Sequence, residues 1–454
     1  MAAYLLAILA GCGPAVSSGA PGGNAPEPSN GAQQRGQGNS VLDPLPMYRD
    51  AGLIVAGPPL PFIGSVRFLA SSTPESTLTL VTLSFANRAL AFTNEGQTQR
   101  AVYGASIDIK QGPATIKRLD VRQTVRVSTF REATRTDESV IYEHFFMLPP
   151  GRYLLSVAIR DEGSANAGSQ SATITVPRFS PGTLSTPIPV YQVTPRTRLD
   201  TVPSLITNPR AAAVLGRDTL APIYLEGYGL SPSSRIVVAV LSDKKNLILE
   251  DTIRIAQHGP MSSARLDFPV GRIGIGRLSM IASLVGSVDT VETPLLITIS
   301  EDFAITSFDE LLSYLRFYAT PERLQVLRDA PPDKRAAAWA AFWKATDPNP
   351  ATPEHEGLRD YFLRIRQANQ RFGEEGGPGW LTDRGKVFVT LGEPDQVLEQ
   401  QRSQTDTRGR AQGWDYSQFH VQFVFVDQTG FNRWRLTAQS QADFDRISRQ
   451  EMVH

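Results

Sequence analysis

The chain has 454 residues, of which 41% are hydrophobic and 20% charged, and its 45 basic side chains are balanced by 45 acidic ones. This length predicts two to four domains, and the composition is typical of core-forming globular proteins rather than disordered ones. The balanced charge lacks the basic excess that binding to phosphates requires, so we expect no nucleic-acid partner. A single cysteine excludes an intramolecular disulfide.

The N-terminal residues 1–12 resemble a bacterial lipoprotein signal. Cys12 is the only cysteine, and it ends the run Leu9-Ala10-Gly11-Cys12 behind an apolar stretch. This run resembles the lipobox, in which the cysteine thiol is alkylated by a diacylglyceryl group and its amine is then acylated. Each buried CH₂ contributes roughly 0.8 kcal/mol, so two or three acyl chains would hold the protein at a bilayer. The alternative is a buried N-terminal strand with an incidental cysteine.

Lipid attachment at Cys12 would place the folded part in the cell envelope. Gly13 stands where an Asp is associated with inner-membrane retention, so we expect the outer membrane, with the protein facing the periplasm. No later stretch is long and apolar enough to predict a spanning helix. Residues 13–46 are rich in Gly, Ser and Pro and predict a disordered tether.

Two β-rich units follow, at residues 47–178 and 199–300. In both, short runs of alternating hydrophobic residues are divided by turn residues, a pattern that predicts β-sandwiches. The phrase Pro150-Gly151-Arg152-Tyr153 resembles the tyrosine corner of immunoglobulin-like domains, in which the tyrosine bonds back to the backbone. The two units could be tandem copies of one fold or two different folds. Residues 179–198, rich in Pro and Thr, predict an extended linker between them.

The hydrophobic period changes from two to about 3.6 after residue 300, which predicts a helical segment at 301–375. Ser307 followed by Glu310 forms a capping-box pattern. Three further helix starts are expected, at Thr320-Pro321, Asp333 and Thr352-Pro353. The aromatic stripes of these helices, which include Trp339, are expected to form core rather than a cofactor site.

The remaining residues, 376–454, predict an α+β domain with an antiparallel sheet. Alternation predicts strands at 387–391 and 421–426, and a turn at 427–430 predicts a hairpin with 431–437. The expected fold class is therefore multidomain: two immunoglobulin-like β-sandwich modules, a helical segment and a C-terminal α+β domain.

One motif in this last part is specific. It reads Gly379-Trp380-Leu381-Thr382-Asp383, and it continues through Gly392-Glu393-Pro394-Asp395. It resembles the signature of the GWxTD-domain family, bacterial envelope proteins without an established biochemical activity. The resemblance extends upstream to 342–372 and downstream to 413–431. It implies an envelope protein and assigns no catalytic residue.

The motif also defines the candidate site. We expect Thr382-Asp383-Arg384-Gly385 to be a turn entering a strand, with Glu393 and Asp395 in the turn that leaves it. At about 3.3 Å per residue, such a strand separates the two ends by about 20 Å, more than the roughly 5–10 Å of a glycosidase pair. These residues either shape turns beside a buried Trp380 or form a shallow ligand site. The candidate residues are Trp380, Thr382, Asp383, Arg384, Glu393 and Asp395.

Signatures of familiar chemistry are missing elsewhere in the sequence. The five histidines have no metal-ligand spacing, no Gly-x-Ser-x-Gly motif occurs, and the loop 271–276 does not match a nucleotide-binding loop. We therefore expect no catalytic residue, no metal and no cofactor.

Two functional hypotheses follow. The first is a non-enzymatic binding, scaffold or assembly module with an envelope protein or glycan as partner. The alternative is a hydrolase of cell-wall glycan or peptide that uses carboxylates such as Asp383, Glu393, Asp395 or Asp415. The sequence leaves the oligomeric state open.

Overall fold

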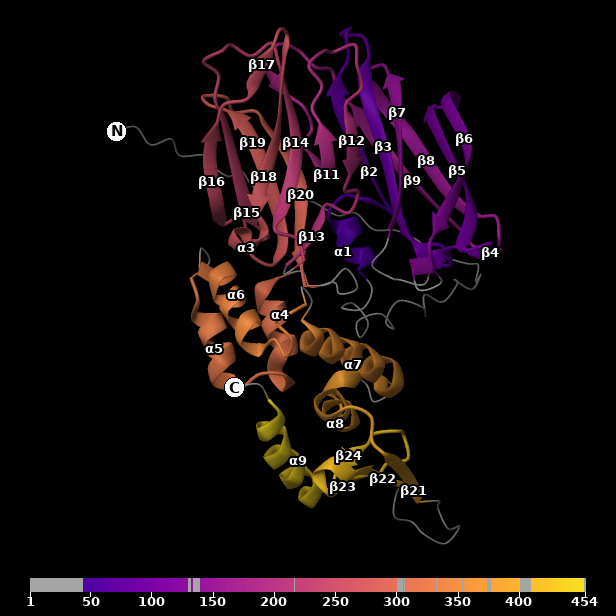
Figure 1. The fold of residues 1–454 in the computed structure, drawn as a ribbon, viewed down its shortest axis with the longest axis vertical. Coiled ribbons are helices and arrows are strands. Elements are labelled where there is room, and N and C mark those ends of the chain that lie inside the picture. The colour runs from indigo at the N-terminus through magenta and orange to yellow at the C-terminus, as the bar shows by residue number, and fades with distance from the viewer. Residues whose placement is uncertain are drawn as a thin grey trace, which may run out of the picture. The chain divides into compact units, whose positions relative to one another are not determined.

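The computed structural model describes residues 44–129, 132–133, 139–215, 217–299, 305, 307–331, 334–352, 355–373, 377–400 and 410–452. Cys12, its signal and the predicted tether up to residue 43 lie outside the described residues. The described residues all belong to one compact unit. Its described part is mostly β-sheet, with several antiparallel sheets and with helices toward the C-terminus (Figure 1). None of the described helices is long and apolar enough to cross a membrane.

The first β-unit follows helix α1 (Leu45–Asp50) and contains two sheets that share one hydrophobic cluster. One sheet has the order β1-β2-β3-β7, with β1 (Ile54–Ala56), β2 (Phe62–Ala70), β3 (Thr77–Ala86) and β7 (Ser139–Leu148). In the other, β5 (Thr98–Gln111) pairs with β6 (Ala114–Val127) and β8 (Gly151–Asp161), while β4 (Thr93–Glu95) pairs with β5 and β9 (Ala167–Val176) with β8. Alternate residues such as Leu83 and Ile107 fill the space between the sheets.

The predicted tyrosine contact is present at the start of β8. The hydroxyl of Tyr153 donates a hydrogen bond of 2.8 Å to the carbonyl of Pro149, four residues upstream. Tyr153 is buried, and its ring belongs to the hydrophobic cluster of this unit. The contact therefore fixes the turn between β7 and β8 to the core.

The second β-unit also has two sheets on one core. One has the order β12-β11-β14-β18-β17, with β10 beside β14: β10 (Thr183–Leu184), β11 (Ile188–Thr194), β12 (Ser204–Thr207), β14 (Leu220–Tyr228), β17 (Ala256–His258) and β18 (Met261–Pro269). The other has the order β13-β20-β19-β15-β16: β13 (Ala212–Val214), β15 (Ile236–Ser242), β16 (Leu247–Ile253), β19 (Gly276–Leu284) and β20 (Thr290–Thr298). Helix α3 (Val270–Ile273) connects β18 to β19.

The expectation of an extended linker at residues 179–198 is wrong. This segment contains β10 and β11, and both pair with β14 of the second unit. Ile188 and Val190 of β11 are each 1% exposed or less. A proline such as Pro189 argues against a strand in a local sequence pattern. The strand forms nevertheless, because burial against the first β-unit stabilises it.

The two β-units join face to face through β3, which is buried on both sides. Its residues Leu78 and Leu80 pack against Ile188 and Tyr224 of the second unit, while Val81 and Leu83 face the core of the first. A strand buried on both faces makes the two units one packed body rather than two modules on a flexible connection.

A buried ion pair lies at this junction. Arg196 and Glu226 have side chains that are 2% and 0% exposed, and two hydrogen bonds of 2.8 Å join the guanidinium to the carboxylate. Tyr224 and Tyr228 each donate to Glu226 at 2.6 Å, and Arg196 also donates to the carbonyl of Ala70 in β2 at 2.6 Å. Burial alone would lower the pKa of Arg196, but the bonds and charge of Glu226 outweigh it and raise that pKa.

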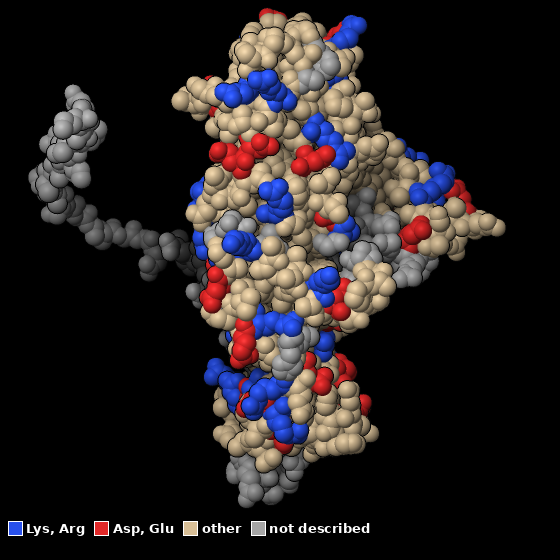
Figure 2. Space-filling model, turned by 60° about the vertical axis from the view of Figure 1, so that its left-hand side comes forward, with Lys and Arg blue, Asp and Glu red and all other residues tan. Residues whose placement is uncertain are grey.

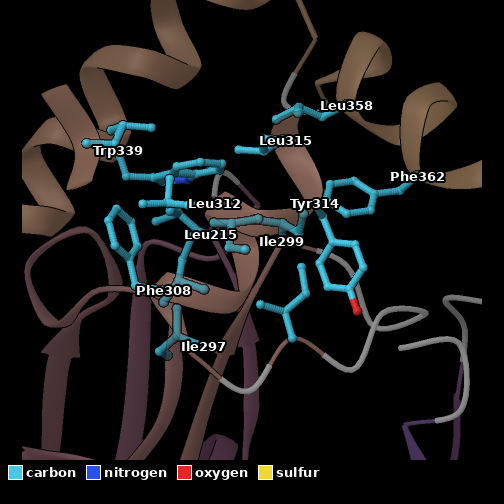
Figure 3. Packing of buried hydrophobic residues seen from close by; sticks show 14 of the residues in the cluster. Leu215, Ile297, Ile299, Phe308, Leu312, Tyr314, Leu315, Trp339, Leu358 and Phe362 are labelled. Atoms are coloured by element: carbon cyan, nitrogen blue, oxygen red, sulfur yellow. The ribbon is translucent and has the colours of Figure 1, made fainter. Parts of the chain in front are cut away.

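The helices continue the core of the second β-unit without a break. They are α4 (Phe308–Tyr314), α5 (Pro321–Asp329), α6 (Arg335–Thr346), α7 (Glu356–Phe372), α8 (Asp383–Leu391) and α9 (Ala438–Glu451), with the 3₁₀ turns η2 (Leu315–Phe317), η5 (Gly379–Leu381) and η6 (Ser417–Phe419). Figure 3 shows Ile297 and Ile299 of the β-unit beside Phe308 and Leu312 of α4. One hydrophobic cluster therefore links the β-unit to the C-terminal part.

The helix starts agree with the sequence in two of the four places. The Ser307 hydroxyl accepts from the Glu310 amide at 3.1 Å, and Pro321 is the first residue of α5. Asp333 lies outside the described residues. The expectation for Thr352 is wrong: α7 is capped by His355, because the imidazole lies where it can accept from a helix amide.

The C-terminal sheet has the order β21-β22-β23-β24, with β21 (Gln396–Gln400), β22 (Arg410–Tyr416), β23 (Val421–Asp427) and β24 (Arg435–Leu436). The predicted hairpin is confirmed by the pairing of Phe425 with Leu436. Trp414 and Phe423 lie on the inner face, against Phe372 of α7 and Phe444 of α9.

The strand expected at 387–391 is wrong, because these residues belong to helix α8. The consecutive residues Val387, Phe388 and Val389 are all buried, with neighbours on several sides. Alternation with period two predicts a strand that has one buried and one exposed face. Helix α8 is enclosed by α7, α9 and β24, so residues 387–389 have no exposed face and the pattern does not apply.

Glu226→Gln should destabilise the protein by about 3–5 kcal/mol, because it leaves the Arg196 charge buried without its counter-ion. The midpoint of urea unfolding measures the effect. The exposed pair Arg198 and Asp200 provides the control, and Asp200→Asn should leave the midpoint nearly unchanged. Equal effects of the two substitutions would contradict a structural role for the buried pair.

Candidate functional site

Trp380 is buried at the centre of the motif, with 4% of its surface exposed. Its amide donates to the Oδ1 atom of Asn369 in α7 at 3.0 Å. Its ring lies 5.2 Å from the ring of Tyr314 and 5.7 Å from that of Phe317, between centroids. The Arg316 guanidinium lies 5.1 Å from its centroid. The indole thus joins η5 to the end of α4, and it is not open to a ligand.

Thr382 caps helix α8. Its hydroxyl accepts from the amide of Gly385 at 3.0 Å and donates to the carbonyl of Gly379 at 2.7 Å. A Cβ atom on Gly385 would lie 1.8 Å from the carbonyl oxygen of Gly379, and one on Gly379 would lie 2.2 Å from that of Ala368. The backbone of α8 therefore touches that of η5, and η5 touches α7. Only glycine leaves room for such close approach at residues 379 and 385.

Asp383 and Arg384 connect α8 to the sheet. The Oδ2 atom of Asp383 accepts from the amide of Leu436 in β24 at 2.8 Å, and Oδ1 lies 3.2 Å from the Lys386 ammonium. The Arg384 guanidinium lies between two rings, 5.0 Å from the centroid of Phe372 and 5.1 Å from that of Trp434. Both side chains of the motif thus contribute to tertiary packing.

The remaining acids lie toward the other end of α8. Glu393 forms an ion pair with Arg371, and Asp395 accepts from the amide of Ser417 at 2.6 Å. The nine-residue helix rises about 1.5 Å per residue and thus separates its ends by about 12 Å. A strand would have separated these ends by about 20 Å. The helix makes the distance shorter, but Asp383 and Glu393 still lie at opposite ends of it.

Asp395 and Asp415 lie closer together. The Asp395 amide donates to the Asp415 carbonyl at 2.9 Å, and Asp415, Ser417 and His420 line a shallow hollow of about 290 Å³. The hydrogen bonds from Ser417 lower the pKa of the Asp395 carboxyl. A general acid requires a raised pKa instead. Among the described residues, no three His, Cys, Asp or Glu side chains form a metal-ligand group.

Sequence reasoning missed a buried carboxylate of the C-terminal sheet, Asp427. Its side chain is 0% exposed and accepts hydrogen bonds from Arg410, Thr429 and the amides of Gly430 and Asn432. Burial alone would raise its pKa, but these bonds hold the pKa far below the ordinary value. The phrase Asp427-Gln428-Thr429-Gly430 contains the signal, since Asp at the start of a turn binds amides further along.

His355 is the second residue that the sequence did not single out. Its Nδ1 atom accepts from the amide of Leu358 at 3.1 Å, so its Nε2 atom carries the proton and donates to Thr346 at 2.9 Å. Burial lowers the pKa of His355, although Asp347 and Glu356 act in the opposite direction. Protonation of Nδ1 would remove the cap of α7.

Comparison with known proteins gives one family match. Residues 286–445 match the model of the GWxTD domain. No curated protein matches the chain.

Basic and acidic side chains are interspersed over the face drawn in Figure 2.

Two solved structures have weak similarity. Dimeric latent PorU from Porphyromonas gingivalis is 10% identical with a TM-score of 0.23, covering 52% of this chain and 20% of that one. The β-glucuronidase of Bifidobacterium dentium, complexed with coumarin-3-O-glucuronide, is 8% identical with a TM-score of 0.17, covering 48% of this chain and 39% of that one. The chain thus spans well under half the length of either, and similarity this low identifies no shared function.

Gly385→Ala should destabilise the protein by about 1–3 kcal/mol or more, because the added Cβ would lie 1.8 Å from the carbonyl oxygen of Gly379. Thermal unfolding measures the change. Gly377 has no atom within 4 Å of the corresponding position, so Gly377→Ala is the matched control and should have little effect. A Gly385→Ala protein as stable as this control would disprove the close approach.

Stability should fall as the pH decreases below about 6.5, the ordinary pKa of His, toward the lowered pKa of folded His355. In this window the unfolded chain binds a proton that the folded chain does not, so the unfolding free energy decreases. His355→Asn keeps a cap acceptor and should reduce this slope in urea titrations between pH 7 and 5. His420→Asn, at an exposed position, is the control; an unchanged slope in His355→Asn would refute the prediction.

Proposed function

The chain contains a GWxTD domain at residues 286–445, and from this premise we propose that the protein is a lipid-anchored, non-enzymatic scaffold or assembly module of the bacterial cell envelope. The observation that carries the proposal is the use of the motif itself. Trp380, Thr382, Asp383 and Arg384 all bind or pack against other elements of the same chain. Motif side chains that are all engaged in contacts within the chain support a structural role, because catalytic groups must face a reacting atom.

The β-units support a scaffold of two immunoglobulin-like modules. The contact from Tyr153 to Pro149 has the geometry of a tyrosine corner. Contacts across β3 and the Arg196–Glu226 pair hold the modules together. A joined pair of modules suits a protein that keeps a C-terminal domain at a defined place, with an envelope protein or glycan as its partner.

The anchor in this proposal is Cys12, and the tether runs from residue 13 up to helix α1, which begins at Leu45. The resemblance to a lipobox and the single thiol support this assignment. The location that follows is the outer membrane, with the folded part in the periplasm. Two acyl chains or more are sufficient for stable attachment without a spanning helix.

One observation favours the hydrolase as a second candidate. The Asp395 amide donates to the Asp415 carbonyl, and Asp415 lines the hollow together with Ser417, the residue whose amide Asp395 accepts from. The lowered pKa of Asp395 suits a base or nucleophile, and the mechanism would need a second, protonated carboxyl. Incubation of the purified chain with peptidoglycan should give no soluble fragments; release that disappears in Asp395→Asn would favour the hydrolase.

Cys12→Ala should abolish labelling by a clickable fatty acid and move the protein from the membrane fraction to the soluble fraction, because no thiol remains for acylation. In-gel fluorescence and fractionation measure the two effects. Ser17→Ala, in the predicted tether, is the control and should behave as wild type. Equal labelling of Cys12→Ala and wild type would remove the anchor from the proposal.

A further inference from the structure

Strand β6 lies at the outer margin of the first β-unit and has an open edge (Figure 1). Its backbone pairs with β5, and no other described backbone group forms a hydrogen bond with it. The N–H and C=O groups of every second residue therefore point away from the sheet. With 14 residues, β6 is the longest described strand at the end of a sheet.

This edge lacks the usual protection. Proteins keep exposed sheet edges short, or block them with a proline, a bulge or an inward-pointing charge. Among the described sheets, β1, β12, β13, β17 and β24 are end strands of two to four residues. Residues 119–127 of β6, which we call the β6 edge, contain no proline and pair with β5 in regular register. The inward-facing charge of Lys117 lies just before them.

The inner face of the β6 edge is apolar and incompletely covered. Leu119, Val121 and Val125 pack against the hydrophobic cluster of the first β-unit yet remain partly exposed, as does Val127. Ile107, on the same face of β5, is fully buried. An added strand would pair the open backbone groups and cover this apolar row together. The fitting occupant is therefore an extended strand with apolar residues at alternate positions.

The β6 edge is itself such a strand, and its inner face matches a second copy. Directly opposite residues of an antiparallel pair have side chains on the same face, so a two-fold axis between two copies passes through a residue. With the axis at Gln123, Leu119 lies opposite Val127 of the second copy. Val121 then lies opposite Val125. Every apolar residue of the row thus meets another apolar residue.

The outer face selects the same axis. An axis at Gln123 sets Asp120 opposite Arg126 of the second copy, and Arg122 opposite Thr124. Moving the axis by one residue in either direction would set arginine opposite arginine, which is destabilising. Moving it by two would set the amide of Gln123 opposite an apolar residue. Only the axis at Gln123 avoids both mismatches.

Ion pairs within the chain do not oppose this arrangement. Asp120 lies 3.3 Å from Arg118, and Arg126 lies 2.8 Å from Glu95, but 63% of the Asp120 side chain and 57% of the Arg126 side chain are exposed. Exposed pairs of this kind contribute little and exchange readily. The charges therefore select the register, whereas the backbone bonds and the apolar row provide the association.

We propose that the β6 edge is a self-association site, at which two copies of this chain pair antiparallel about Gln123 and join their β5–β6 sheets into one. A second copy supplies both the free backbone edge and the complementary side chains that this site requires. The inference goes beyond the proposed scaffold function and does not rest on the lipid anchor.

The first test uses the full chain with Cys12→Ala, which removes the natural thiol and any acyl chain. In this background, Gln123→Cys would set two thiols opposite each other at the axis. Facing residues have Cα atoms about 4.5–5.5 Å apart, which suits a disulfide. Mild oxidation should therefore give a covalent dimer on a non-reducing gel. Thr115→Cys is the matched control, since residue 115 is equally exposed on β6, but its two copies would lie about 50 Å apart.

The second test is sedimentation equilibrium of the same Cys12→Ala chain, for which we expect a reversible dimer. Thr124→Arg faces Arg122 in both halves of the interface and should weaken the dimer roughly two- to thirtyfold. Thr124→Glu should strengthen it, because it reverses the sign of the same contact. Thr115→Arg is the control and should have no effect. Thr124 is exposed, and equal unfolding midpoints verify the fold of each variant.

Three results would overturn the proposal. A monomer at every concentration would do so, and it would leave a strand of a different protein as the occupant of the edge. Equal cross-linking at residues 115 and 123 would exclude the axis, as would a dimer that both Thr124 variants leave unchanged. All these proteins carry Cys12→Ala, so failure of the self-association site is distinguishable from failure of the envelope anchor.

Discussion

The contact between two backbones at Gly379 and Gly385 is the constraint on which the C-terminal domain depends. With no side chain on either residue, α8 begins directly against η5, and η5 against α7. This placement sets Asp383 beside the Leu436 amide and Arg384 between Phe372 and Trp434. A methyl group between the backbones would displace all these contacts together. The motif therefore connects α7, α8 and β24 of the C-terminal domain, and its polar side chains make their contacts inside the chain.

The motif is connected to the rest of the protein by continuous packing of buried side chains. Trp380 contacts Tyr314, and α4 packs against Ile297 and Ile299 of the second β-unit. The family match begins at residue 286 and so includes β20, which agrees with a core that does not stop at residue 300. The buried Arg196–Glu226 pair then ties this unit to the first. Such continuity suits the proposed scaffold, because the C-terminal domain is held on a rigid support.

The sequence predicted elements best where local chemistry and burial agree. Ser307 caps α4 as expected, and Phe423 and Phe425 alternate on a sheet with one buried face. It failed where burial follows neighbours distant in the chain. Residues 387–391 alternate in hydrophobicity yet form a helix, because several elements surround them. Residues 179–198 resemble a linker because of their prolines, but β11 within this segment pairs with β14 and faces the first β-unit.

The sequence alone determined the balanced charge, the single thiol at Cys12, the β-rich and helical regions and the motif at 379–383. These depend on residue type and spacing, which a linear pattern records. The tertiary structure decided the roles of the motif residues and revealed the roles of Asp427 and His355. The roles of the motif residues depend on which donors and rings approach from other elements, and the burial of Asp427 and His355 depends on packing against other elements. Close approach and burial are properties of chain segments brought together by packing, and no local pattern encodes them.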